Sequence, residues 1–202
     1  MNTINIMYSD DNLDLAALKC LNELGEKNEN LNIIEDEFTD ESNYEILISK
    51  IKEKNINILI IDSKLYTVDN KNKKYTGEEF RIILKHFFPF IETLIITQND
   101  VPGDDIIKKY DVNENKDMTS GEYYDKFLIS KIKEKIEKIE LSKKLLKEIE
   151  SKETIDKIII EKIELSLEND DSYKELKTSD IDKFVKKFIE LKKMIENGQK
   201  WL

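Results

Sequence analysis

The stretch Ile56-Asn57-Ile58-Leu59-Ile60-Ile61-Asp62 decides the fold of this chain. It is the most apolar run in the sequence, it is rich in β-branched residues, and it is almost uninterrupted. A parallel strand that is covered by helices on both faces has this composition. The run therefore predicts a central, buried parallel strand that ends at Asp62.

Shorter apolar runs alternate with amphipathic segments on both sides of this strand. Further strands are expected at residues 3–8, 31–34 and 93–97, with a fifth within 106–112, and helices at 12–24, at 42–54 with Ser42 as its cap, and from Gly77 to Pro89. Alternation with short links indicates βαβ units and right-handed crossovers. The predicted fold class is α/β, a doubly wound five-stranded parallel sheet followed by a mainly α-helical C-terminal extension.

The pattern changes near residue 122. A heptad-like stripe begins there, formed by Ile129, Ile132, Ile136, Ile139 and Leu146. Thr154 is a candidate cap for a second helix, and Ser179 or Asp180 for a third. Because residues 158–160 are all β-branched, a strand in that segment is the alternative. We expect an α/β domain over 1–122, whose last helix continues to about residue 150, and a helical module over 123–202.

Charge and cysteine content narrow the classes of function. The net charge is −10, and residues 121–202 carry equal numbers of lysines and acids, so the whole excess lies in 1–120. An acidic domain does not favour nucleic acid. The single cysteine, Cys20, and the lack of a secretory signal indicate a cytoplasmic protein. No apolar run approaches the ~20 residues that span a bilayer, so no membrane partner is expected.

Polar side chains follow three of the expected strands. Asp10 and Asp11 come after the first, Asp62 after the third, and Thr97 closes the fourth. The carboxyl ends of parallel strands converge on one crevice, where three carboxylates would repel one another unless a cation neutralised them. Mg²⁺ suits such a site. Alternatively, Asp10 and Asp11 merely cap the following helix.

These motifs resemble the receiver domain of response regulators over about residues 3–140. The similar segments are Met7-Tyr8-Ser9-Asp10-Asp11-Asn12, Ile58-Leu59-Ile60-Ile61-Asp62, Gly77-Glu78-Glu79-Phe80 and Ile95-Ile96-Thr97. The resemblance implies a flavodoxin-like receiver with Asp62 as phosphoacceptor. It also implies a set of supporting groups: Asp10, Asp11, Asp62 and the Lys64 backbone carbonyl as Mg²⁺ ligands, Thr97 on the phosphoryl oxygen, and Lys109 on the phosphate, with Lys108 and Lys116 as alternatives.

The resemblance further implies a two-component signalling protein. A histidine kinase or another phosphodonor would modify it, and its C-terminal helices would relay the change to a protein effector or a second copy of the chain. Such a domain catalyses at most its own phosphorylation and dephosphorylation.

Two other hypotheses stay open. The long segment between Asp62 and Gly77, and the absence of a Lys-Pro pair after the fourth strand, fit a pseudo-receiver that acts as a phosphorylation-independent interaction module. The third hypothesis is a phosphate-ester hydrolase that uses Asp62 or Asp10.

Overall fold

The computed structural model describes residues 3–39, 44–64, 76–151 and 157–174, together with positions 186 and 189. Five strands of this described part form one parallel sheet in the order β2-β1-β3-β4-β5. They are β1 (Ile4–Asp10), β2 (Leu31–Glu37), β3 (Ile56–Asp62), β4 (Glu92–Thr97) and β5 (Ile106–Lys108). This is the doubly wound order of flavodoxin-like folds, so the predicted fold class is confirmed.

The central strand is the one that the apolar run predicts. Every residue of β3 is buried, and Ile60 pairs with Tyr8 of β1 on one side and with Leu94 of β4 on the other. Successive side chains of a strand point to opposite faces. Because both faces are covered, the sequence of β3 is apolar on both faces rather than alternating, and its polar residues are Asn57 and the terminal Asp62.

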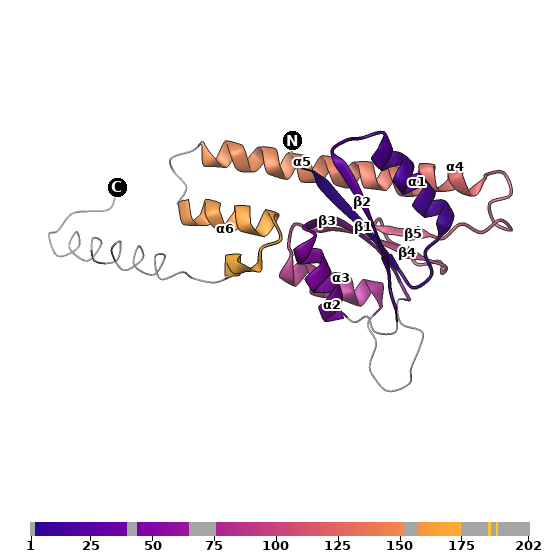
Figure 1. Cartoon of the computed structure of the whole chain (residues 1–202), viewed down its shortest axis with the longest axis horizontal. Helices are drawn as coiled ribbons and strands as arrows, with labels where there is room; N and C mark the ends of the chain where they lie inside the picture. Colours follow the sequence, from indigo (N-terminus) through magenta and orange to yellow (C-terminus); the bar gives the residue numbers. More distant parts are fainter. Residues whose placement is uncertain are drawn as a thin grey trace, which may run out of the picture.

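Helices cover the two faces of the sheet (Figure 1). α1 (Leu15–Glu26) and the long helix that contains α5 (Ser130–Glu150) lie on one face, where Tyr8, Ile60 and Leu94 pack against Leu21 and Ile132. α2 (Tyr44–Glu53) and α3 (Gly77–Phe87) cover the other face. There Met7, Leu59 and Ile61 of the sheet pack against Leu47 and Phe80.

The chain after β5 is helical. α4 (Ser120–Tyr124), a π-helical turn (η1, Asp125–Ile129) and α5 follow one another directly, and α4 and α5 run in line across the sheet (Figure 1). α5 ends at Glu150, and its stripe residues Ile132, Ile139 and Leu146 are buried. The existence of a separate module over 123–202 stays a prediction.

Beyond α5 the described chain forms α6 (Lys157–Leu167) and a short 3₁₀ turn (η2, Asp171–Lys174). Residues 158–160 lie within α6, so the strand alternative is wrong. The predicted caps at Ser42 and Thr154, and most of the helix expected after Ser179 or Asp180, lie outside the described residues. No helix in the described part of the chain is both long and apolar enough to cross a membrane.

Candidate metal centre

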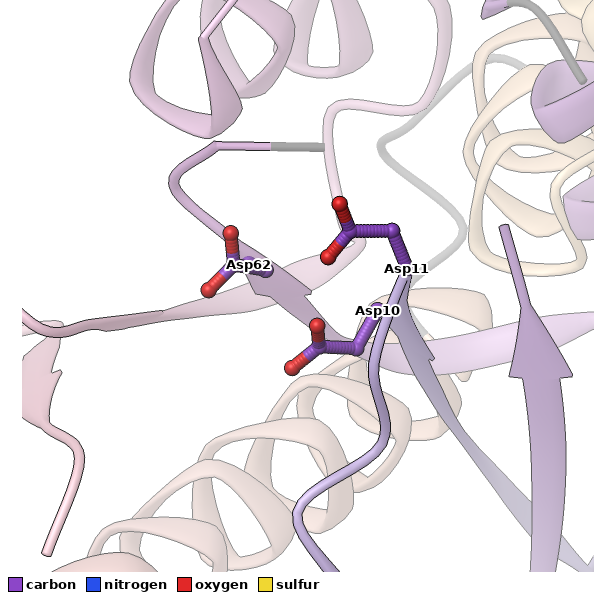
Figure 2. Close-up of side chains that lie close together, drawn as sticks. All are labelled: Asp10, Asp11 and Asp62. Carbon is purple, nitrogen blue, oxygen red and sulfur yellow. The ribbon is translucent and has the colours of Figure 1, made fainter. Parts of the chain in front are cut away.

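Three carboxylates gather at the carboxyl edge of the sheet. β1 ends at Asp10 and β3 at Asp62, and the two strands are parallel neighbours. One carboxylate oxygen from each of Asp10, Asp11 and Asp62 lies within 4.8 Å of the others. Figure 2 shows the three carboxyl groups beside one another. The juxtaposition predicted from the strand ends is therefore present.

Asp10 is the most enclosed of the three acids. Its side chain is fully buried, whereas Asp11 is exposed. Oδ1 of Asp10 accepts a hydrogen bond of 3.0 Å from the backbone N–H of Asn12, and Oδ2 accepts one of 2.7 Å from the Tyr8 hydroxyl. A buried carboxylate is stable only when such donors replace its lost hydration. The carboxylate orientation is therefore set by the protein.

Lys109 brings a positive charge between the two buried acids. Its ammonium Nζ lies 2.8 Å from Oδ2 of Asp10 and 2.9 Å from Oδ1 of Asp62. The backbone N–H of Lys109 donates to the Thr97 carbonyl oxygen at 2.6 Å, which extends the β4–β5 pairing past the end of β5. The side chain is therefore delivered from the edge strand toward the centre of the site.

The protonation state of Lys109 follows from its partners. Burial alone lowers the pKa of a lysine, but here the hydrogen bonds and charges of Asp10 and Asp62 outweigh burial, and the pKa is raised. Lys109 stays protonated at neutral pH. Lys108 instead pairs with Asp100 at 2.8 Å and Glu114 at 2.5 Å, and Lys116 is exposed.

The capping alternative for Asp10 and Asp11 is wrong. α1 begins at Leu15, and its N-cap is Asp14, whose Oδ1 accepts from the backbone N–H groups of Ala16 (2.9 Å) and Ala17 (3.1 Å). An N-cap carboxylate reaches donors two and three residues ahead. Because the helix starts later than predicted, Asp10 and Asp11 are too far from its first turn.

Thr97 and Lys64 lie at the same edge. Thr97 is buried at the end of β4, one residue after Ile96, the register partner of Asp62, and its hydroxyl accepts from the Asn99 backbone N–H at 3.2 Å. The backbone N–H of Lys64 donates to Oδ2 of Asp62 at 2.5 Å. The phosphoryl contact of Thr97 and the metal contact of the Lys64 carbonyl stay predictions.

The site also contains residues that sequence reasoning missed. Tyr8 supports Asp10 directly, and a signal existed, since both residues lie on one face of β1 at the spacing of two. Tyr124 of α4 reaches Asp14, and no sequence signal joins residues so far apart.

The donor set fits a hard divalent cation. It consists of carboxylate oxygens, and Mg²⁺ typically binds through one or two carboxylates while it keeps several waters. The ammonium of Lys109 shows that a cationic group is already favourable between Asp10 and Asp62. The described part of the chain is therefore a doubly wound α/β fold with a cluster of three acids and one lysine at the carboxyl edge of its sheet.

Comparisons with known proteins add little to this description. No family model matches the chain, and no curated protein matches it. Among solved structures, a complex of the two-component response regulator RcsB with DNA is similar, with 18% sequence identity over 83% of this chain and 93% of that chain and a TM-score of 0.38. We draw no conclusion from a similarity of this size, and the fold class rests on the strand order.

Proposed function

We propose that this chain is a receiver-like cytoplasmic signalling protein. It accepts a phosphoryl group on Asp62 with Mg²⁺ and relays the change to a protein effector through its helical C-terminal region. The observation that supports this most directly is the ammonium of Lys109, which joins Asp10 and Asp62 at 2.8 and 2.9 Å while Asp11 offers a third carboxylate.

The transfer step uses groups of this chain. A carboxylate oxygen of Asp62 attacks the phosphorus of a phosphohistidine, the O–P bond forms as the P–N bond breaks, and the released imidazole nitrogen keeps the electron pair and takes up a proton from water. Mg²⁺ held by Asp10, Asp11 and Asp62 would supply charge neutralisation, which is the main requirement of phosphoryl transfer.

Lys109 then changes partners. The phosphoryl group adds roughly −1.5 to −2 charge beside the ammonium, which turns from the carboxylate of Asp62 toward the phosphoryl oxygens. Because the backbone N–H of Lys109 donates a hydrogen bond to the Thr97 carbonyl oxygen, a movement of Lys109 displaces the ends of β4 and β5. The C-terminal helix begins shortly after this point, at Ser120.

Thermal unfolding with Mg²⁺ and beryllofluoride tests the proposal. We expect the two together to raise the melting temperature of the wild type, the Asp62→Asn variant to lose this gain, and the Asp104→Asn control to keep it. Asp104 is an exposed aspartate before β5, at the opposite edge of the sheet. A wild type that gains nothing from beryllofluoride would contradict the proposal and favour the pseudo-receiver. Turnover of a generic phosphate ester would favour the hydrolase.

A further inference from the structure

A series of four buried or partly buried hydrogen bonds leads from the acidic site to the long helix that begins with α4. The hydroxyl of Tyr8 donates to Oδ2 of Asp10 at 2.7 Å and accepts from the backbone N–H of Asp14 at 3.2 Å. The hydroxyl of Tyr124 donates to Oδ2 of Asp14 at 2.5 Å and accepts from the backbone N–H of Tyr110 at 3.1 Å. Each tyrosine therefore connects one carboxylate with one backbone amide.

The direction of every bond in this series is determined by chemistry. Carboxylates only accept hydrogen bonds and backbone N–H groups only donate them, so each tyrosine hydroxyl donates its hydrogen bond to a carboxylate. Tyr8 and Tyr124 are both fully buried, and burial, together with the neighbouring carboxylates, raises the pKa of both hydroxyls. They therefore remain protonated donors at neutral pH.

The series of hydrogen bonds leads back to the acidic site. Tyr110 follows Lys109 in the sequence, and the ammonium of Lys109 lies 2.8 Å from Asp10, where the series begins. One route from Asp10 passes through Tyr8, Asp14 and Tyr124, and the other passes through Lys109. α4 carries none of the three acids, yet Tyr124 of α4 contacts both routes, since its hydroxyl bonds Asp14 on one route and the residue after Lys109 on the other.

We propose that Tyr8 and Tyr124 are positioning residues of the candidate metal centre, so that its affinity for a divalent cation depends on the seating of α4. The identity of the cation rests on the proposed function. Coupling between two sites is reciprocal, so a cation that requires Tyr124 in place also holds the first turn of the long helix in place. If the cation changes the affinity of a partner for the long helix by some factor, the partner changes the affinity of the site for the cation by the same factor.

The neighbouring residue offers a matched control. Tyr123 lies on the same helix, is also buried, and donates its hydroxyl to the Lys108 carbonyl oxygen at 3.1 Å. This contact ties α4 to the end of β5, two residues before Tyr110, whose backbone N–H bonds Tyr124, but it reaches no carboxylate. Tyr123→Phe and Tyr124→Phe therefore differ in the link to Asp14 and share the loss of a tyrosine hydroxyl.

Calorimetric titration with Mg²⁺ alone measures the effect on the site. Loss of a group that orients a ligand commonly costs 10–100-fold in metal affinity, so we expect Tyr8→Phe to weaken Mg²⁺ binding about tenfold or more. Tyr124→Phe, one step further away, should weaken it about fivefold. Tyr123→Phe should bind like the wild type. Equal Mg²⁺ affinities for Tyr123→Phe and Tyr124→Phe would overturn the proposal.

A double-mutant cycle without ligand tests the same chain of bonds independently. Urea unfolding gives the unfolding equilibrium constants of Tyr8→Phe, Tyr124→Phe and the double variant. The effects of the two substitutions should be non-additive: the fold-change in this constant for the double variant should be at least about threefold smaller than the product of the fold-changes for the single variants. Additive effects would overturn the positioning roles whatever Mg²⁺ does. If Mg²⁺ binds as expected but beryllofluoride has no effect, the proposed function fails and the positioning roles stand.

Discussion

The backbone of Gly77 packs against the backbone of Asp62. A methyl group added to the α-carbon of Gly77 would lie 2.6 Å from the carbonyl oxygen of Asp62 and 3.2 Å from the α-carbon of Ser63. The N–H of Gly77 also donates to the Ser63 carbonyl oxygen at 3.1 Å. The first residue of α3 thus supports the turn that presents the Asp62 carboxylate, and no larger residue fits there.

Gly77→Ala should therefore disturb both stability and the site. Overpacking against backbone typically costs about 1–3 kcal/mol in the free energy of unfolding, which urea denaturation measures. Mg²⁺ affinity should fall as well, because Asp62 is displaced. Gly121→Ala is the control: nothing lies within 4 Å of its added methyl group, and the change should stabilise α4 by about 0.4–1 kcal/mol. Equal losses in both variants would contradict this account.

Removal of the Lys109 charge should leave Asp10 and Asp62 repelling each other. Breaking a buried ion pair costs about 3–5 kcal/mol, so Lys109→Met should be destabilised by that amount in the absence of divalent cations. Mg²⁺ should restore more stability to the variant than to the wild type, because it replaces the lost charge. Lys116→Met, which removes an exposed lysine from a nearby loop, should stay within about 0.5 kcal/mol of the wild type.

The raised pKa of Lys109 also sets the sign of a pH effect. Its ordinary pKa is about 10.4, so its contribution is fully present at neutral pH and disappears only as the pH rises through the higher pKa of the folded state. Urea unfolding between about pH 9 and 12 should show an alkaline loss of stability in the wild type that is smaller in Lys109→Met. Parallel alkaline curves for the two proteins would be inconsistent with the ion pair.

A second buried lysine holds the opposite edge of the sheet. Nζ of Lys135 on α5 lies 2.9 Å from Oε2 of Glu92 and 2.5 Å from Oδ1 of Asp105, and Arg81 of α3 lies 3.6 Å from Asp105. Helices from both faces therefore meet at Asp105. Lys135→Met should destabilise the protein by about 3–5 kcal/mol, whereas Lys133→Met, an exposed lysine on the same helix, should have little effect.

Asp105 makes this edge sensitive to acid. Burial raises the pKa of the Asp105 carboxyl, but the hydrogen bond and charge of Lys135 and the charge of Arg81 outweigh burial, and the pKa is lowered. Stability from this pair is present above the ordinary pKa of about 3.9 and is lost as the pH falls through the lowered one. Acid unfolding should therefore show a smaller pH-dependent loss in Lys135→Met than in the wild type.

The buried side-chain amide of Asn169 joins the end of the α6 segment to the start of β3. Nδ2 of Asn169, just after α6, donates to the Ile56 carbonyl oxygen at 2.7 Å and to Oδ1 of Asn55 at 3.2 Å, and Asn169 has a φ of 56°. Asn169→Gly keeps this conformation easily but leaves the buried carbonyl without its partner, at a cost of about 1–3 kcal/mol. Hydrogen exchange of α6 should accelerate. Unchanged protection of α6 would mean that other contacts hold it.

Much of the fold was accessible from local patterns. The apolar run of β3 identified the central strand, because burial on both faces favours apolar residues on both sides of a strand, and Asn57 is the one polar residue before Asp62. The acids were predictable for a related reason: the carboxyl ends of neighbouring parallel strands must share an edge. The extent of β2 was less predictable, since its polar second half, Glu35–Glu37, pairs with β1 through the backbone and through the hydrogen bond of 2.8 Å that the Ser9 hydroxyl donates to Asp36.

The assignment of the helix cap and of the lysine was not accessible in the same way. The sequence offered Asp10 and Asp11 as caps, whereas the cap is Asp14, because the choice depends on where α1 starts once it is packed on the sheet. Lys108 and Lys109 are adjacent at the end of an edge strand, where successive side chains point to opposite faces. The register of β5 on β4 turns Lys109, and not Lys108, toward the acids.

The sequence by itself determined the parallel α/β sheet, its central strand and the edge at which three acids meet, because these follow from hydrophobic burial and strand direction. Only the tertiary structure decided which groups satisfy those acids: Lys109 from the edge strand, Tyr8 from the same strand face as Asp10, and, through Asp14, Tyr124 from the distant helix. The reason is physical. Burial is a property of each segment, whereas a buried charge takes its partners from whatever segments the packing brings within hydrogen-bonding distance.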